Sequence, residues 1–201
     1  MKISSLSLQL VAVTVLTTGA AWAQNTPAEQ DQQRDVNQQQ RIEQGLQSGQ
    51  LSTREAGSLE RQQQHIDNME SRDMKNGPMT AAEQRNLDAA QNKASNSIYA
   101  DKHNGVTGNP NSASSQRMQA DVQRNVNQQQ RIQNGMDKGS LTNHEAGSLE
   151  KGQAHVNRKE ANAAANGHVG AGEQRRIQGS QNRQSGRIYN KKHNAVTKPN
   201  R

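Results

Sequence analysis

Apolar residues recur along the chain at the spacing of amphipathic helices, and they are few. In the first half of the chain the recurring positions are Val36, Ile42, Leu46, Leu59, Ile66, Met69, Leu87, Ala90, Ala94 and Ile98. No segment of strand length alternates strictly between apolar and polar residues. The pattern predicts three helices, over residues 31–47, 52–75 and 80–103, and therefore an all-α fold with a thin core.

Capping signals and glycines mark the predicted helix boundaries. Ser52 and Glu55 have the spacing of a capping box, as do Thr80 and Glu83. In such a box the hydroxyl accepts a hydrogen bond from a free amide of the first turn, and the glutamate reaches back to the cap. A glycine stands three residues before each box, where a left-handed residue can end the preceding helix. We therefore expect helices joined by short glycine-centred turns.

The chain contains a long internal repeat. Residues 36–110 align with residues 126–200 without a gap, and VNQQQRI, EAGSLE and IYxxKHN occur in both copies. The segment between the copies is rich in Gly, Asn, Ser and Pro, which is typical of a flexible linker. The sequence thus predicts a tandem duplication of a three-helix unit, or helical hairpin. Its expected parts are a first helical repeat at 24–104, a linker at 105–117, a second helical repeat at 118–194 and a basic tail at 195–201.

The first 23 residues have the features of a secretory signal peptide. Lys2 precedes an apolar run from Leu10 to Leu16, and the small residues Ala21 and Ala23 stand where signal peptidase requires them. The run is too short to span a bilayer, and no later segment approaches the ~20 apolar residues that a span needs. We expect cleavage after Ala23 and a periplasmic or secreted protein.

The composition argues against an enzyme. Hydrophobic residues make up 29% of the chain and aromatic residues 1%, and there is no cysteine. So few large side chains cannot line an apolar substrate pocket, and no nucleophile elbow, zinc-protease or phosphate-loop motif is present. We expect a non-enzymatic protein without a cofactor.

Charge divides unevenly between the two copies. Residues 24–112 hold 9 basic and 12 acidic residues, whereas residues 113–201 hold 15 basic and 6 acidic residues. A concentration of cations on the last predicted helix can attract polyanions or simply be a solvated face, and the acidic copy could also pair with the basic one. Sequence-specific nucleic-acid binding is not expected, because stacking side chains are too few. The polyanion-binding candidates are Arg175, Arg176, Arg183, Arg187, Lys191 and Lys192.

Four histidines occupy corresponding positions in the two copies. His65 corresponds to His155, and His103 corresponds to His193. Histidine is the commonest side-chain ligand for transition metals, so these four are candidate ligands of a metal-buffering site. No two of them lie three or four residues apart, so a site would need several helices, and ordinary surface or capping roles are the simpler explanation.

Two short resemblances accompany this pattern. The glycine-centred turns resemble the second half of an EF-hand loop, but the first half lacks the oxygen ligands that calcium needs, so a capped helix-turn-helix accounts for them. MTAAEQRNL at 79–87 and LTNHE at 141–145 resemble the LTxxQ motif of periplasmic helical chaperones typified by Spy. That resemblance implies an exported, all-helical, ATP-independent holdase or metal-stress sensor. More broadly, the chain resembles small secreted helical proteins of Gram-negative bacteria.

The sequence thus favours an exported, non-enzymatic helical interaction protein, chaperone-like or linked to envelope stress, that binds a protein partner or itself. Metal buffering through the histidine-containing helices and polyanion binding by the second repeat are the alternatives.

A structural clasp is also expected in each copy. If the second and third helices form a hairpin about Gly77, Tyr99 lies opposite Ala56, where Gly57 leaves room for the ring. The same hairpin geometry in the second copy places Tyr189 opposite Ala146 and beside Gly147. The residues after each tyrosine would then close the third helix onto the start of the second.

Overall fold

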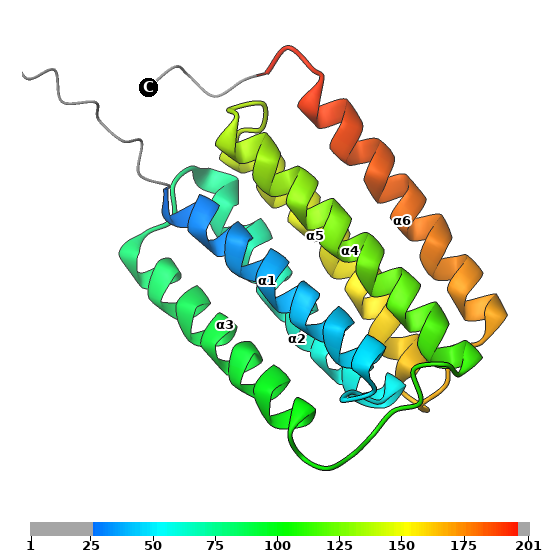
Figure 1. The fold of residues 1–201 in the computed structure, drawn as a ribbon. Coiled ribbons are helices and arrows are strands. Elements are labelled where there is room, and N and C mark those ends of the chain that lie inside the picture. Colours follow the sequence, from blue (N-terminus) through cyan, green and yellow to red (C-terminus); the bar gives the residue numbers. More distant parts are fainter. Residues whose placement is uncertain (1–25, 197–201) are drawn as a thin grey trace, which may run out of the picture.

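The computed structural model describes residues 26–196, and these form an all-α fold, as the apolar pattern predicts (Figure 1). The first repeat contains α1 (Pro27–Ser48), α2 (Thr53–Asp73), the short 3-10 helix η1 (Met74–Asn76) and α3 (Ala81–Lys102). The second repeat contains α4 (Ala113–Asp137), α5 (Asn143–Ala164) and α6 (Ala171–Lys192). The predicted signal peptide and most of the predicted tail lie outside the described residues. None of the helices described is long and apolar enough to cross a membrane.

The two predicted capping boxes form as expected, and so does the corresponding box at Thr142 in the second repeat. Ser52, Thr80 and Thr142 each accept a hydrogen bond from the amide three residues on. The glutamate at that position accepts one in return from the amide of the cap, at 2.9, 2.8 and 3.2 Å respectively. The glutamates of the EF-hand-like turns therefore cap helices.

The linker differs from its prediction. Ser112 caps α4, which begins at Ala113, so the last part of the predicted 105–117 linker is helical. The remaining part packs against the turn between α1 and α2, where the amide of Gly108 donates to the carbonyl of Gly49 at 2.8 Å. The sequence alone gave no sign of this contact, because it joins backbone atoms.

The two repeats pack against each other. Helix α2 packs along α5 and α1 along α4, so these four helices form a central bundle, while α3 and α6 lie at its opposite outer edges (Figure 1). One apolar cluster contains Leu46 and Leu59 of the first repeat together with Met118 and Val122 of the second. The repeats therefore share a core.

The predicted tyrosine clasp is wrong. Tyr99 is 62% exposed and Tyr189 is 58% exposed. The space beside Gly57 is taken by the other repeat, because a Cβ on Gly57 would lie 2.5 Å from the Cβ of Ala164. A Cβ on Gly147 would likewise lie 3.1 Å from the Cβ of Met74. These glycines, with the buried Ala56 and Ala146, let α2 and α5 approach closely.

The end of the third helix does close onto the start of the second, but through an amide. Asn104 Nδ2 donates to Glu55 Oε1 at 2.8 Å, and Asn194 Nδ2 donates to Glu145 Oε1 at 2.6 Å. Each capping glutamate therefore holds two helices together.

The middle of the bundle is polar. The two larger apolar clusters lie towards opposite ends of the central helices. Between them, buried carboxyl groups and amides fill the interior. The pattern of apolar positions does not predict this polar interior. Amides donate to several of these carboxyl groups, as Gln39 does to Glu60 at 3.0 Å and Gln129 to Glu150 at 3.1 Å. The buried acids of the bundle interior are Asp31, Asp35, Glu60, Asp67, Glu70, Asp121, Glu150 and Glu160.

Candidate anion-binding face

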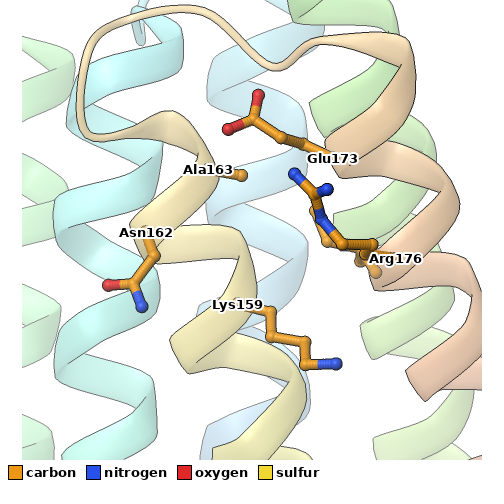
Figure 2. A pocket seen from close by; sticks show the side chains of 6 residues that line it. Lys159, Asn162, Ala163, Glu173 and Arg176 are labelled. Atoms are coloured by element: carbon orange, nitrogen blue, oxygen red, sulfur yellow. The ribbon is translucent and has the colours of Figure 1, made fainter.

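Two cavities follow one another between α5 and α6. The first has a volume of about 440 Å³ and is lined by Lys151, Gly152, His155, Ser180, Arg183, Gln184 and Arg187. The second has a volume of about 210 Å³ and is lined by Lys159, Asn162, Ala163, Glu173, Arg176 and Ile177. Figure 2 shows the second cavity, where Lys159 extends from α5 towards α6 while Glu173 and Arg176 extend from α6 towards α5.

A further cavity lies on the other side of α5, against α2. It has a volume of about 170 Å³ and is lined in part by Lys151, His155 and Arg158. Basic side chains therefore border α5 on both sides. We call the cations of α5 and α6 that line these three cavities the basic face: Lys151, Arg158, Lys159, Arg176, Arg183 and Arg187.

Gly152 shapes the first cavity. A Cβ at this position would collide with the side-chain oxygen of Gln184 and lie 2.6 Å from Arg187 Nη1. Without that Cβ, Gln184 packs onto α5 and donates to the carbonyl of Leu149 at 2.8 Å. Arg187 also crosses to α5, where its Nη2 donates to the carbonyl of Ser148 at 2.6 Å. The glycine thus allows α6 to place a guanidinium over α5.

The positive charge of the basic face is not compensated locally. The first cavity has no carboxylate in its wall, and none of the six cations forms an ion pair with a described residue. Lys159 Nζ and Arg183 Nη2 instead both donate to the hydroxyl of Ser180, at 2.6 and 3.1 Å. In the second cavity, Glu173 accepts a hydrogen bond from the amide of Gly170 as a helix cap.

The pKa of His155 is sensitive to the positive charge of the basic face. This pKa lies below the ordinary value because partial burial of the ring disfavours the charged form, and because Lys159, Arg158 and Arg183 oppose a further positive charge. His155 Nδ1 lies 3.0 Å from a guanidinium nitrogen of Arg158. The basic face therefore holds a concentrated positive potential that an anion would relieve.

The basic face belongs to the second repeat alone. At the corresponding positions of the first repeat, neutral residues replace four of its six cations. Only Arg61 and Lys93 keep the charge of Lys151 and Arg183. The replacements in the first repeat are Asn68 for Arg158, Met69 for Lys159, Asn86 for Arg176 and Ser97 for Arg187.

The sequence-derived polyanion candidates are only partly brought together. Arg176, Arg183 and Arg187 line the cavities. Arg175 is exposed on α6 but lines neither of the α5–α6 cavities, and Lys191 and Lys192 lie half-buried at the end of that helix. The cations of α5 are not among the sequence-derived candidates. Their spacing of seven and eight residues from Lys151 to Arg158 and Lys159 would have placed them on one helix face.

The four candidate metal-binding histidines are all exposed. His103 and His193 end α3 and α6, where each ring stacks on the tyrosine four residues before it with centroids 4.2 Å apart. Among the described residues, the geometry of a metal site occurs in one group, and no histidine belongs to it. His65 and His155 lie on α2 and α5. The structure therefore does not gather the four histidines into a common site.

No family model, curated protein or solved structure matches this chain.

Proposed function

We propose that the protein is an exported, non-enzymatic binding protein that captures phosphate-bearing polyanions on its basic face. The observation that carries this proposal is the uncompensated charge of the cavities beside α5. Six cations line them, with Glu173 as the one carboxylate among the described lining residues. Arginine and lysine are the side chains that bind phosphate oxygens best, and arginine can do so with two parallel hydrogen bonds.

The layout of the cations suits a polymer better than a single small anion. The cavities between α5 and α6 follow α5 from Lys151 to Ala163, a distance of roughly 18 Å at the rise of an α-helix. A single phosphate would instead need donors that converge on one point. A chain of repeated negative charges can contact the cations in succession, and the release of its counterions would drive binding.

The side chains of the basic face favour recognition of charge over recognition of bases. His155 is the one ring among the described residues that line these cavities. Base recognition by single-strand binders relies on aromatic stacking platforms. We therefore propose binding that depends strongly on salt and little on sequence.

The same surface argues for a charged ligand over an unfolded client protein. The large hydrophobic side chains that the described residues expose are Tyr99, Val106, Tyr189 and Val196. A holdase needs a continuous apolar surface, and four scattered side chains do not provide one.

Binding of inorganic polyphosphate of defined length to residues 24–201 tests this proposal. Calorimetric titration should show binding that weakens steeply between low and physiological salt. Replacing four cations by their first-repeat counterparts should weaken binding about tenfold or more. The test variant is Arg158→Asn, Lys159→Met, Arg176→Asn and Arg187→Ser.

A charge-matched variant supplies the control. It removes the same number of exposed or half-exposed cations from the first repeat, and none of these lines the three cavities. We expect its affinity to change by less than about threefold, through net charge alone. An equal loss in both variants would show that overall charge, and no particular face, attracts the polymer. The control variant is Arg61→Gln, Arg85→Gln, Lys93→Gln and Lys102→Gln.

A further inference from the structure

Three buried carboxyl groups meet in the middle of the bundle. Asp35 lies on α1, and Asp67 and Glu70 lie on α2, three residues apart and thus on one face of that helix. One carboxylate oxygen from each can be chosen so that all three lie within 4.8 Å of one another. All three side chains are buried, with exposures of 0, 1 and 0%.

Amides from α1, α3 and α5 orient these carboxyl groups. Gln91 of α3 donates to Asp35 Oδ1 at 3.0 Å, and Asn157 of α5 donates to Asp67 Oδ2 at 2.8 Å. Gln32, one turn before Asp35 on α1, donates to Glu70 Oε2 at 3.3 Å. One oxygen of each carboxyl group is therefore fixed by a donor.

Two of the opposite oxygens lack an amide donor. Asp35 Oδ2 and Glu70 Oε1 are buried and accept no hydrogen bond from an amide, hydroxyl or amine of the described residues, but the Asp35 and Glu70 carboxyl groups lie close enough to share a proton in a hydrogen bond with each other. The side-chain oxygen of Gln32, which is fully buried and whose amide nitrogen bonds Glu70, also has no partner there. Buried acceptors without a donor are costly, because water no longer solvates them. A bound cation would stabilise all three oxygens, whereas a proton shared between Asp35 and Glu70 would leave the side-chain oxygen of Gln32 without a partner.

The same position in the second repeat carries amides in place of two of the carboxyl groups. Asn125, Asn157 and Glu160 correspond there to Asp35, Asp67 and Glu70. Asn125 Nδ2 donates to Asn157 Oδ1 at 3.1 Å and to Glu160 Oε2 at 2.6 Å. Gln181, the counterpart of Gln91, donates to Glu160 Oε1 at 3.0 Å. Two amides in place of two carboxyls therefore give Asn157 and Glu160 internal donors, and in this network the side-chain oxygen of Gln181 stays without a partner among the described residues.

No basic side chain balances the first-repeat cluster. The charged groups that act on Asp67 are Glu150, Asp35, Glu60 and Glu160, and all are acidic. Arg34 acts weakly on Asp35, and it forms an ion pair with Asp88 at 2.8 Å.

We propose that Asp35, Asp67 and Glu70, with the side-chain oxygen of Gln32, bind one hard divalent cation of the Mn²⁺, Mg²⁺ and Ca²⁺ class. The donors are all oxygen atoms, which these cations prefer. The absence of histidine and cysteine from the group argues against zinc and copper. The amides that hold the opposite oxygens would orient the ligands. The site binds independently of the basic face, which lies on the outer side of α5 and on α6.

Manganese binding to residues 24–201 tests the proposal. The protein is stripped with a chelator, unfolded in guanidinium and refolded with Mn²⁺, so that the ion can reach the interior. Electron paramagnetic resonance of the free ion should then show about one Mn²⁺ bound per chain at about 1 mM or below, the range of weak extracellular sites. The melting temperature should rise by about 5 °C in its presence, and Mg²⁺ or Ca²⁺ in excess should displace it.

The second repeat supplies the variant and its control. Asp35→Asn with Asp67→Asn gives the first repeat the residues of the second. This variant should fold, melt no lower than the metal-free wild type and bind no Mn²⁺. Glu160→Gln, in the corresponding network of the second repeat, should leave the stoichiometry at about one. The proposal is overturned if the refolded wild type binds no Mn²⁺, because protons then suffice for the cluster, or if the double variant keeps the ion.

Discussion

The close approach of α2 and α5 depends on single residues without a side chain. Gly57→Ala would place a Cβ 2.5 Å from that of Ala164. Overpacking of this kind costs ~1–3 kcal/mol, which outweighs the ~1 kcal/mol that alanine gains in a helix. Urea denaturation should therefore show a lower free energy of unfolding for Gly57→Ala.

A glycine in an open position provides the comparison. A Cβ at Gly186, inside α6, would meet nothing within 4 Å. Gly186→Ala should therefore raise the free energy of unfolding by up to ~1 kcal/mol. A stabilised Gly57→Ala would contradict the close packing of the two repeats.

At the scale of helices, the turns that precede α2, α3, α5 and α6 differ in whether a side chain caps the helix that follows. Ser52 accepts the hydrogen bond of Glu55, whereas Gly170 begins α6 with no side-chain hydrogen bond. Ser52→Ala should lower the melting temperature through the loss of ~1 kcal/mol, and Gly170→Ser should raise it through a gain of a few tenths. Thermal unfolding followed by circular dichroism measures both. Equal melting temperatures for wild type and Ser52→Ala would show that this cap carries no stability.

The helices could be predicted from the sequence, because their boundary signals act within one turn. Ser52, Thr80 and Thr142 cap helices through residues only three positions away. What those helices pack against depends on distant residues. Hairpin geometry is local and pairs Gly57 with a ring of its own repeat, whereas its true neighbour, Ala164, belongs to the other repeat.

The polar interior was harder to predict for a related reason. The sequence pattern predicts that glutamine and glutamate on a helix are exposed to solvent, and they are buried here because the second repeat covers them. Gln39 and Glu60 are buried by this pairing. The α6 part of the basic face can be predicted, because its cations are dense in the sequence. The α5 part cannot be predicted from local density, because Lys151 and Arg158 are separated by two helical turns.

For the whole molecule, the buried acids predict a dependence of stability on pH. Burial raises the pKa of Glu60 to about 7, although Gln39 donates to it, and Asp121 of α4 adds a repulsive charge. Burial also raises the pKa of Asp121 to about 7, partly offset by Arg124. The acids Asp67 and Glu160 act on the same region from α2 and α5.

The direction in which the free energy of unfolding changes with pH follows from proton uptake by the folded protein. Between pH ~4 and ~7 the folded protein holds protons on Glu60 and Asp121 that the unfolded chain releases. The resulting stability is fully present below pH ~4 and is lost as the pH rises through ~7. The free energy of unfolding in metal-free buffer should thus be higher at pH 5 than at pH 8, by a few kcal/mol. Glu60→Gln should flatten this profile, and a wild-type protein that is more stable at pH 8 would contradict the assignment.

The pairing of two similar repeats in one chain also bears on how chains assemble. The contacts between α2 and α5 and between α1 and α4 join halves that are tied only by the residues from 103 to 112. Two chains that open at this connection can exchange their second repeats and rebuild the same contacts between molecules. Such an exchange creates no new interface, so local chain concentration would decide between monomer and swapped dimer. A polyanion that gathers several chains along its length would raise that concentration.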